Sequence, residues 1–143
     1  LDGDLKVAPA FQFLLYPWVD MSGESDSIQR FGKGLILTQE TMSFFRDAYL
    51  PNELEPQATK SSPILCEDMS LTPDTLIVTA EYDVLRDEGL ALVSKLQRAE
   101  VSVSHLHLPD CTHGFISTGK FSPATRKRLN EVAAMFDTYT ASI

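Results

Sequence analysis

The sequence predicts a three-layer α/β fold in which about three parallel strands lie between flanking helices. Short apolar segments alternate along the chain with segments whose apolar residues recur every three or four positions. Residues 76–80 (LIVTA) show no polar alternation, which is typical of a parallel strand buried on both faces. Because strands and helices alternate, the connections are expected to be right-handed crossovers.

The first part of the chain contains one expected strand and one expected helix. Residues 11–16 are apolar and rich in aromatic residues, and Pro17 ends this strand. Residues 18–37 carry clusters of Ser, Gly and Asp and predict a loop. Thr38 can cap a helix over residues 39–50. Three aromatic residues of this helix are expected in the core, with a pocket wall as the functional alternative: Phe44, Phe45 and Tyr49.

The second part of the chain continues the alternation. The strand at 76–80 is followed by an amphipathic helix over residues 85–99, whose apolar residues repeat at steps of three and four. Residues 101–108 alternate between two sets of side chains and predict another strand. Ser122, which a proline follows, is a typical N-cap for a last helix.

Composition indicates an ordinary globular protein. Of the 143 residues, 43% are hydrophobic and 22% are charged, so residues 1–143 are expected to belong to a single domain. The 12 basic and 20 acidic residues give a net charge of −8, which disfavours nucleic acids and anionic membrane surfaces as partners. No apolar run approaches the roughly 18 residues that a membrane span needs.

The cysteines and the first residues bear on the compartment. Cys66 and Cys111 show no CxxC spacing, which favours free thiols over a disulfide. The start of the chain has no signal-peptide pattern, so the cytoplasm is the expected location. Position 1 is Leu rather than Met, and we therefore expect a fragment or a processed product.

Two residues with catalytic chemistry follow neighbouring strands. Asp83 comes after the strand at 76–80, and His113 comes after the strand at 101–108. Because active groups collect at the carboxyl ends of parallel strands, the two side chains are expected to converge. A histidine oriented by a buried carboxylate is a general base for a nucleophile. The structural alternatives are a helix N-cap for Asp83 and a backbone-bonded loop histidine for His113.

The segments around these residues carry a family resemblance. Residues 76–89 (LIVTAEYDVLRDEG), followed by residues 113–115 (HGF), resemble the C-terminal part of the α/β-hydrolase fold. They are most similar to the hormone-sensitive-lipase-like carboxylesterases. Residues 11–20 (FQFLLYPWVD) and 62–63 (SP) also resemble segments of that family. The resemblance covers nearly the whole chain and is weakest over residues 18–60.

The resemblance implies an activity and partners. Asp83 would be the acid and His113 the base of a serine carboxylesterase that hydrolyses short or medium acyl esters and needs no cofactor. The implied partners are a small-molecule ester and the upstream half of the same protein. The strand at 101–108, placed at the sheet edge by the resemblance, contains no Pro, Lys or Arg and is expected to form a homodimer contact.

Several family features are missing. The G-x-S-x-G nucleophile elbow and the HGGG-type oxyanion segment occur nowhere in the sequence. Residues 23–27 (GESDS) come close to the elbow but lack its final Gly, and we expect a chance match. The nucleophile-bearing N-terminal half is thus expected to be absent from this chain, and the chain alone to be inactive. The alternative function is a non-catalytic, α/β-hydrolase-derived module that binds ligands.

Two positions near the expected acid and base depart from the family pattern. Val84 stands where the family usually has Pro, so the backbone after Asp83 is expected to differ in rigidity. Asp110 and its neighbour Cys111 replace a frequent Gly-Met pair. This carboxylate is expected near His113, where it would either raise the pKa of the imidazole or compete for its hydrogen bond.

Two rival interpretations remain from the residues alone. A metal site could draw on five side chains near the end of the chain: His105, His107, Asp110, Cys111 and His113. No metal is expected, because the loop part of this cluster matches the hydrolase motif without one. A free-standing flavodoxin-like domain would need about five strands, whereas three are expected here.

Overall fold

The sheet consists of three parallel strands, as the sequence predicts. The computed structural model describes residues 9–23, 25–50, 58–119 and 121–141. Its strands are β1 (Gln12–Leu15), β2 (Thr75–Tyr82) and β3 (Val103–Thr112). They lie in the order β1-β2-β3, and both neighbouring pairs are parallel. The register places Ile77 of the central strand opposite Leu14 on one side and His105 on the other.

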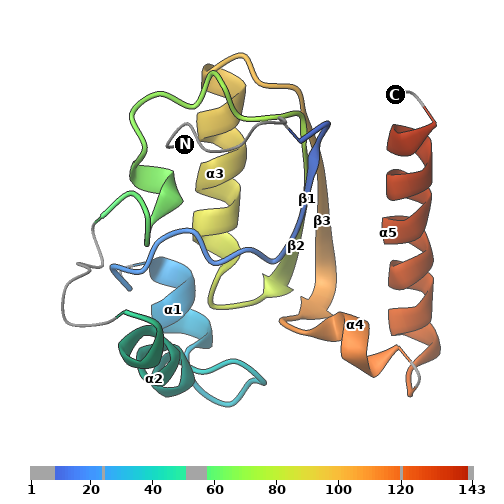
Figure 1. The fold of residues 1–143 in the computed structure, drawn as a ribbon. Helices are drawn as coiled ribbons and strands as arrows, with labels where there is room; N and C mark the ends of the chain where they lie inside the picture. The colour runs from blue at the N-terminus through green and yellow to red at the C-terminus, as the bar shows by residue number, and fades with distance from the viewer. Residues whose placement is uncertain (1–8, 24, 51–57, 120, 142–143) are drawn as a thin grey trace.

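Helices cover both faces of the sheet and give the expected three layers. Figure 1 shows α3 (Arg86–Arg98) on one side of the strands and α5 (Pro123–Thr140) on the opposite side. Successive residues of β2 point to opposite faces. Ile77 therefore packs with residues of α3, while Val78 packs with Val132 of α5. This burial on both faces explains why the strand shows no polar alternation.

The remaining elements are short or lie at the ends of the sheet. They are α1 (Asp26–Phe31), α2 (Gln39–Tyr49), the 3₁₀ turn η1 (Pro63–Leu65) and α4 (Phe115–Thr118). Thr38 caps α2 and Ser122 caps α5 through their side-chain oxygens, as predicted. Within the described part of the chain, no helix is long and apolar enough to cross a membrane.

A glycine allows α3 to approach the sheet closely. A Cβ atom added at Gly89 would lie 2.9 Å from Cγ2 of Thr79 in β2, closer than side chains tolerate. Glycine lowers the helix propensity at this position, but the absence of a side chain lets α3 pack closely on β2. α3 begins three residues after Asp83. Its close packing on β2 therefore also restricts the position of the loop that carries Asp83.

The loop expected over residues 18–37 contains a helix that the sequence analysis missed. Ser25 accepts a hydrogen bond from the backbone N–H of Ile28, and Asp26 lies in the first turn, where the helix dipole favours an acid. Gly32 then ends α1 after six residues. The start signals were present in the sequence, but the helix is too short to show an apolar period.

The aromatic cluster of α2 is exposed, so its expected place in the core was wrong. The side chains of Phe44, Phe45 and Tyr49 are 68%, 50% and 64% exposed. Met42 is the buried residue of this helix. An amphipathic pattern shows that a face is apolar, but it does not show that another element within the same chain covers it.

The last strand is longer than the expected 101–108. β3 continues through Pro109 to Thr112, and the register between β2 and β3 shifts between Ala80 and Tyr82. Proline cannot donate to a strand ladder and is tolerated at irregularities of this kind. The extension carries the chain to His113 at the very end of the strand.

Candidate active site

The structure brings Asp83 and His113 together at the carboxyl end of the sheet. Asp83 follows the last residue of β2, and His113 follows the last residue of β3. Nδ1 of His113 lies 2.9 Å from Oδ2 of Asp83, a hydrogen bond in which the ring nitrogen donates. Asp83 is 1% exposed, whereas the His113 side chain is 23% exposed. The contact uses Nδ1 and leaves Nε2 for a reacting group.

Each oxygen of Asp83 has its own task. Oδ1 accepts a hydrogen bond from the backbone N–H of Leu85 at 2.9 Å, while Oδ2 faces the imidazole. The N-cap alternative was wrong, because Leu85 is the N-cap of α3 and the bond from its N–H to Asp83 forms an Asx turn before the helix. This local bond fixes the carboxylate plane, since the acceptor and donor are two residues apart.

Val84, the departure from the family's Pro, is held through its carbonyl. The Ser27 hydroxyl donates to the Val84 carbonyl oxygen at 2.7 Å, and both residues are buried. In return, the Asp87 carboxylate accepts from the backbone N–H of Ser27 at 2.8 Å. These bonds connect the loop that carries Asp83 to the start of α1. They restrict the backbone at Val84, where the ring of a proline would otherwise do so.

Asp110 does not compete for the hydrogen bond of His113, contrary to expectation. Its two carboxylate oxygens accept from Nε and Nη2 of Arg128 in α5, at 2.7 and 2.9 Å. This two-pronged bond lowers the pKa of Asp110. The thiol of Cys111 is buried, and mainly for that reason its pKa is raised to about 11, which makes it a poor nucleophile.

The two histidines of β3 belong to a polar network. Oγ1 of Thr79 lies 2.9 Å from both Nε2 of His105 and Nδ1 of His107. Nε2 of His107 lies 3.2 Å from the Glu81 carboxylate. Desolvation, together with the neighbouring His107, lowers the pKa of His105. Among the residues that the structure describes, no group of three or more potential ligands is arranged to hold a metal ion.

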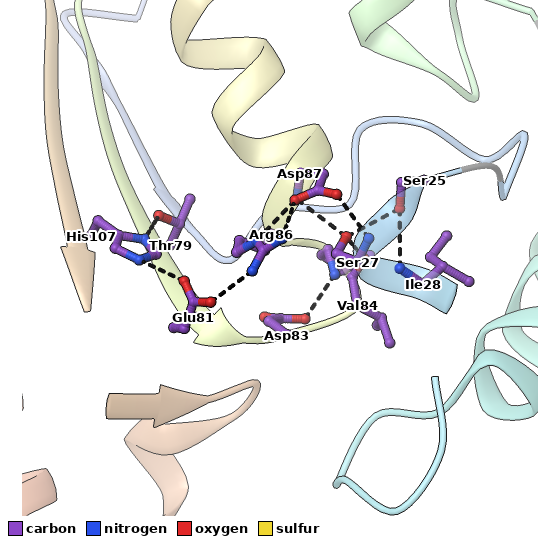
Figure 2. Close-up of polar contacts among 11 residues, drawn as sticks. Ser25, Ser27, Ile28, Thr79, Glu81, Asp83, Val84, Arg86, Asp87 and His107 are labelled. Atoms are coloured by element: carbon purple, nitrogen blue, oxygen red, sulfur yellow. Dashed lines mark hydrogen bonds and ion pairs between the residues drawn. The ribbon is translucent and has the colours of Figure 1, made fainter. Parts of the chain in front are cut away.

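The same network runs on to α1. Figure 2 shows the contacts passing from His107 through Glu81 and Arg86 to Asp87 and on to Ser27. Arg86 donates to Glu81 at 2.7 Å and to Asp87 at 2.9 Å. Arg86 and Asp87 lie directly after the loop of Asp83, so these contacts connect that segment to β3 and to α1.

Glu88 is a buried acid that the sequence analysis missed. It is 5% exposed, and its Oε1 accepts from the backbone N–H groups of Val19 and Asp20, the latter at 3.0 Å. Burial is the main reason why its pKa is raised to about 8. A signal was available, since Glu88 lies next to Gly89 on the face by which α3 packs onto the sheet.

Comparison with known proteins assigns the family. A family model described as alpha/beta hydrolase fold matches residues 2–117. The chain belongs to the alpha/beta hydrolase family. The carboxylic ester hydrolase LipN of Mycobacterium tuberculosis is 33% identical to this hydrolase chain, over 87% of the chain and 33% of the relative. Ethyl acetate hydrolase of Pseudomonas putida is 33% identical over 78% of the chain and 35% of the relative.

Solved structures of alpha/beta hydrolases superimpose closely on this chain. An enzyme from the metagenome of Lake Arreo, Spain, matches with a TM-score of 0.86 and 35% identity, covering 94% of this chain and 43% of that one. A hyperthermophilic esterase of Pyrobaculum calidifontis matches with a TM-score of 0.81 and 28% identity, covering 91% and 43%. The predicted α/β-hydrolase fold and the resemblance to hormone-sensitive-lipase-like carboxylesterases are confirmed. This hydrolase chain spans about a third of the length of the two curated relatives.

Proposed function

We propose that this chain supplies the acid and the base of a serine carboxylesterase that acts on short or medium acyl esters. The observation that supports this proposal best is the hydrogen bond between Nδ1 of His113 and Oδ2 of the buried Asp83. It orients a partly exposed imidazole with its second nitrogen available for proton transfer. The relatives named as ester hydrolases support the substrate class.

The proposed mechanism follows from the two ring nitrogens. Nε2 of His113 removes the proton from a serine hydroxyl while the serine oxygen bonds to the ester carbonyl carbon. Asp83 stabilises the positive charge that forms on the ring. Nε2 then returns the proton to the alcohol oxygen as the bond between the carbonyl carbon and the alcohol breaks. Water, activated in the same way, releases the acid and restores the serine.

The serine is expected to come from a segment outside these 143 residues, because the sequence contains no G-x-S-x-G elbow. The 143-residue chain should therefore not hydrolyse p-nitrophenyl acetate above the rate of the uncatalysed reaction. A longer protein that adds a nucleophile elbow and an oxyanion segment should hydrolyse it. Turnover by the 143 residues alone, lost in His113→Ala, would contradict the proposed source of the nucleophile. A longer protein that binds esters without turnover would favour the ligand-binding alternative.

We also propose that the protein forms a homodimer through the outer side of β3. Among the described strands, β3 lies at the end of the order β1-β2-β3. Its segment 101–108 lacks the Lys, Arg and Pro residues that often block sheet edges. Two such strands related by a two-fold axis could pair antiparallel.

The outward backbone groups of β3 can be tested one at a time. The Ser102 carbonyl accepts from the backbone N–H of Thr75. The backbone N–H and C=O groups of even-numbered residues here therefore point toward β2, and the backbone N–H of Val103 points away from it. Val103→Pro removes this donor and should shift the protein to monomers in analytical sedimentation at tens of micromolar. Val103→Ala keeps the donor and should remain dimeric. A wild-type protein that sediments as a monomer would refute the dimer.

A further inference from the structure

The residue that follows β1 has an unusual backbone conformation. Tyr16 has φ +37°, in the left-handed region that residues other than glycine rarely adopt. Glu100 shares this feature among the described residues, and it lies at the other end of the sheet, after α3. A strained backbone persists where the surrounding structure requires it, and such residues concentrate at functional sites.

The conformation of Tyr16 places its ring against the proposed base. The backbone N–H of Tyr16 donates to the Val78 carbonyl at 2.7 Å, which ties the turn to the central strand. The phenol ring then lies against His113, with ring centroids 4.4 Å apart and an interplanar angle of 59°. On another side it meets the edge of Phe115 at 5.8 Å. Tyr16 is thus held by its backbone and by a neighbouring ring.

We propose that Tyr16 is a positioning residue for His113: its ring holds the imidazole against Asp83 and stabilises it when it carries the proton of the nucleophile. The catalytic part of this inference rests on the proposed esterase function. The positioning part rests on the contact alone.

Two physical effects support this role. A ring packed against the imidazole limits its rotation, so Nδ1 stays in line with the carboxylate of Asp83. A cation within about 6 Å of an aromatic centroid is also attracted by the π electrons, and the 4.4 Å separation lies well inside that range. Burial and the nearby charge of Asp83 raise the pKa of the Tyr16 phenol, so the ring stays neutral while His113 changes its charge.

Two substitutions separate the ring from the strained backbone. Tyr16→Phe keeps the ring and removes the hydroxyl. Tyr16→Asn removes the ring, and asparagine adopts the left-handed region more readily than tyrosine, so the turn itself should be relieved of strain. In the longer, active protein we expect Tyr16→Phe to retain kcat within about twofold. Tyr16→Asn should lower kcat about tenfold with little change in KM, because the contact stabilises the imidazole of His113 most when that imidazole is charged.

A spectroscopic measurement tests the positioning without relying on activity. In the full chain, NMR should show a hydrogen-bonded Nδ1 proton of His113 and ring-current shifts of its carbon-bound protons. Both signals should persist in Tyr16→Phe and in the control Phe11→Leu, which removes an aromatic ring that packs on Phe136 and Tyr139 instead. The Nδ1 proton signal should be lost in Tyr16→Asn, and this loss is the test of positioning, because the ring-current shifts disappear with the ring itself.

Each outcome bears on one of the two claims. If Tyr16→Asn keeps the hydrogen-bonded Nδ1 proton signal of His113, the positioning role is refuted, and the strained turn is merely structural. If the longer wild-type protein has no esterase activity while the signals respond as expected, the proposed function fails and the positioning by Tyr16 stands. If the signals respond but Tyr16→Asn retains full kcat in an active protein, the stabilisation of the charged ring is refuted.

Discussion

Asp83→Asn is expected to lower kcat by about four orders of magnitude in the complete esterase that we propose, while the fold stays intact. The carboxylate at position 83 can only accept a hydrogen bond from Nδ1–H of His113, so the free imidazole nitrogen is Nε2. An amide can instead donate to Nδ1, which places the imidazole proton on Nε2 and removes the base. The amide oxygen can still accept from the backbone N–H of Leu85, so the loop should keep its shape. Ester hydrolysis and circular dichroism measure the two effects.

Asp87→Asn is the matched control for this experiment. Asp87 lies in the same loop region, but its carboxylate binds Ser27 and Arg86 rather than His113. It should lose far less activity than Asp83→Asn. The assignment of the acid would be wrong if Asp87→Asn abolished turnover and Asp83→Asn left it near normal.

Glu88 is expected to make the fold less stable as the pH rises. Its pKa is raised from 4.5 to about 8 in the folded chain, so the folded state keeps a proton that the unfolded state has lost. Between these two values, the contribution of Glu88 to the free energy of unfolding falls by about 1.4 kcal/mol per pH unit, or about 4 to 5 kcal/mol in all. Urea unfolding of the full chain at pH 5 and pH 8 measures this loss.

Glu88→Gln isolates that contribution from those of other groups. The glutamine oxygen can still accept from the N–H groups of Val19 and Asp20, but it never ionises. The variant should gain stability relative to the wild type between pH 5 and pH 8. Glu67→Gln, the same change at an exposed position, should follow the wild type. Equal pH dependence in Glu88→Gln and wild type would show that the acid is not held in its protonated form.

The parts of the fold that could be predicted are those with a local signal. The run at 76–80 is apolar without alternation because β2 is covered on both faces, and this placed Asp83 at a strand end. Ser122 signalled the start of α5 by a bond within four residues. Positions at strand ends then followed from the parallel order, which is why Asp83 and His113 were expected to meet.

The parts that could not be predicted depend on partners far away in the sequence. The burial of Glu88 had a signal in the helix pattern, but its partners did not, because they are backbone groups 69 and 68 positions earlier. Ser27 likewise binds the carbonyl of Val84 57 positions later. No local pattern marks a backbone N–H that lacks a strand or helix partner. Asp110 was expected near His113 because the two are close in sequence, but the guanidinium of Arg128 in α5 donates two hydrogen bonds to its carboxylate.

The ion pair between Asp110 and Arg128 is exposed to solvent and therefore responds to the salt concentration. The side chains of Asp110 and Arg128 are 52% and 22% exposed, whereas that of Asp83 is 1% exposed. Dissolved ions screen exposed charges over about 10 Å at 0.1 M ionic strength and screen buried ones much less. Concentrated salt therefore weakens the ion pair that connects α5 to β3, the strand that His113 follows. The buried carboxylate of Asp83 keeps its hydrogen bond to the imidazole of His113 in the same solution.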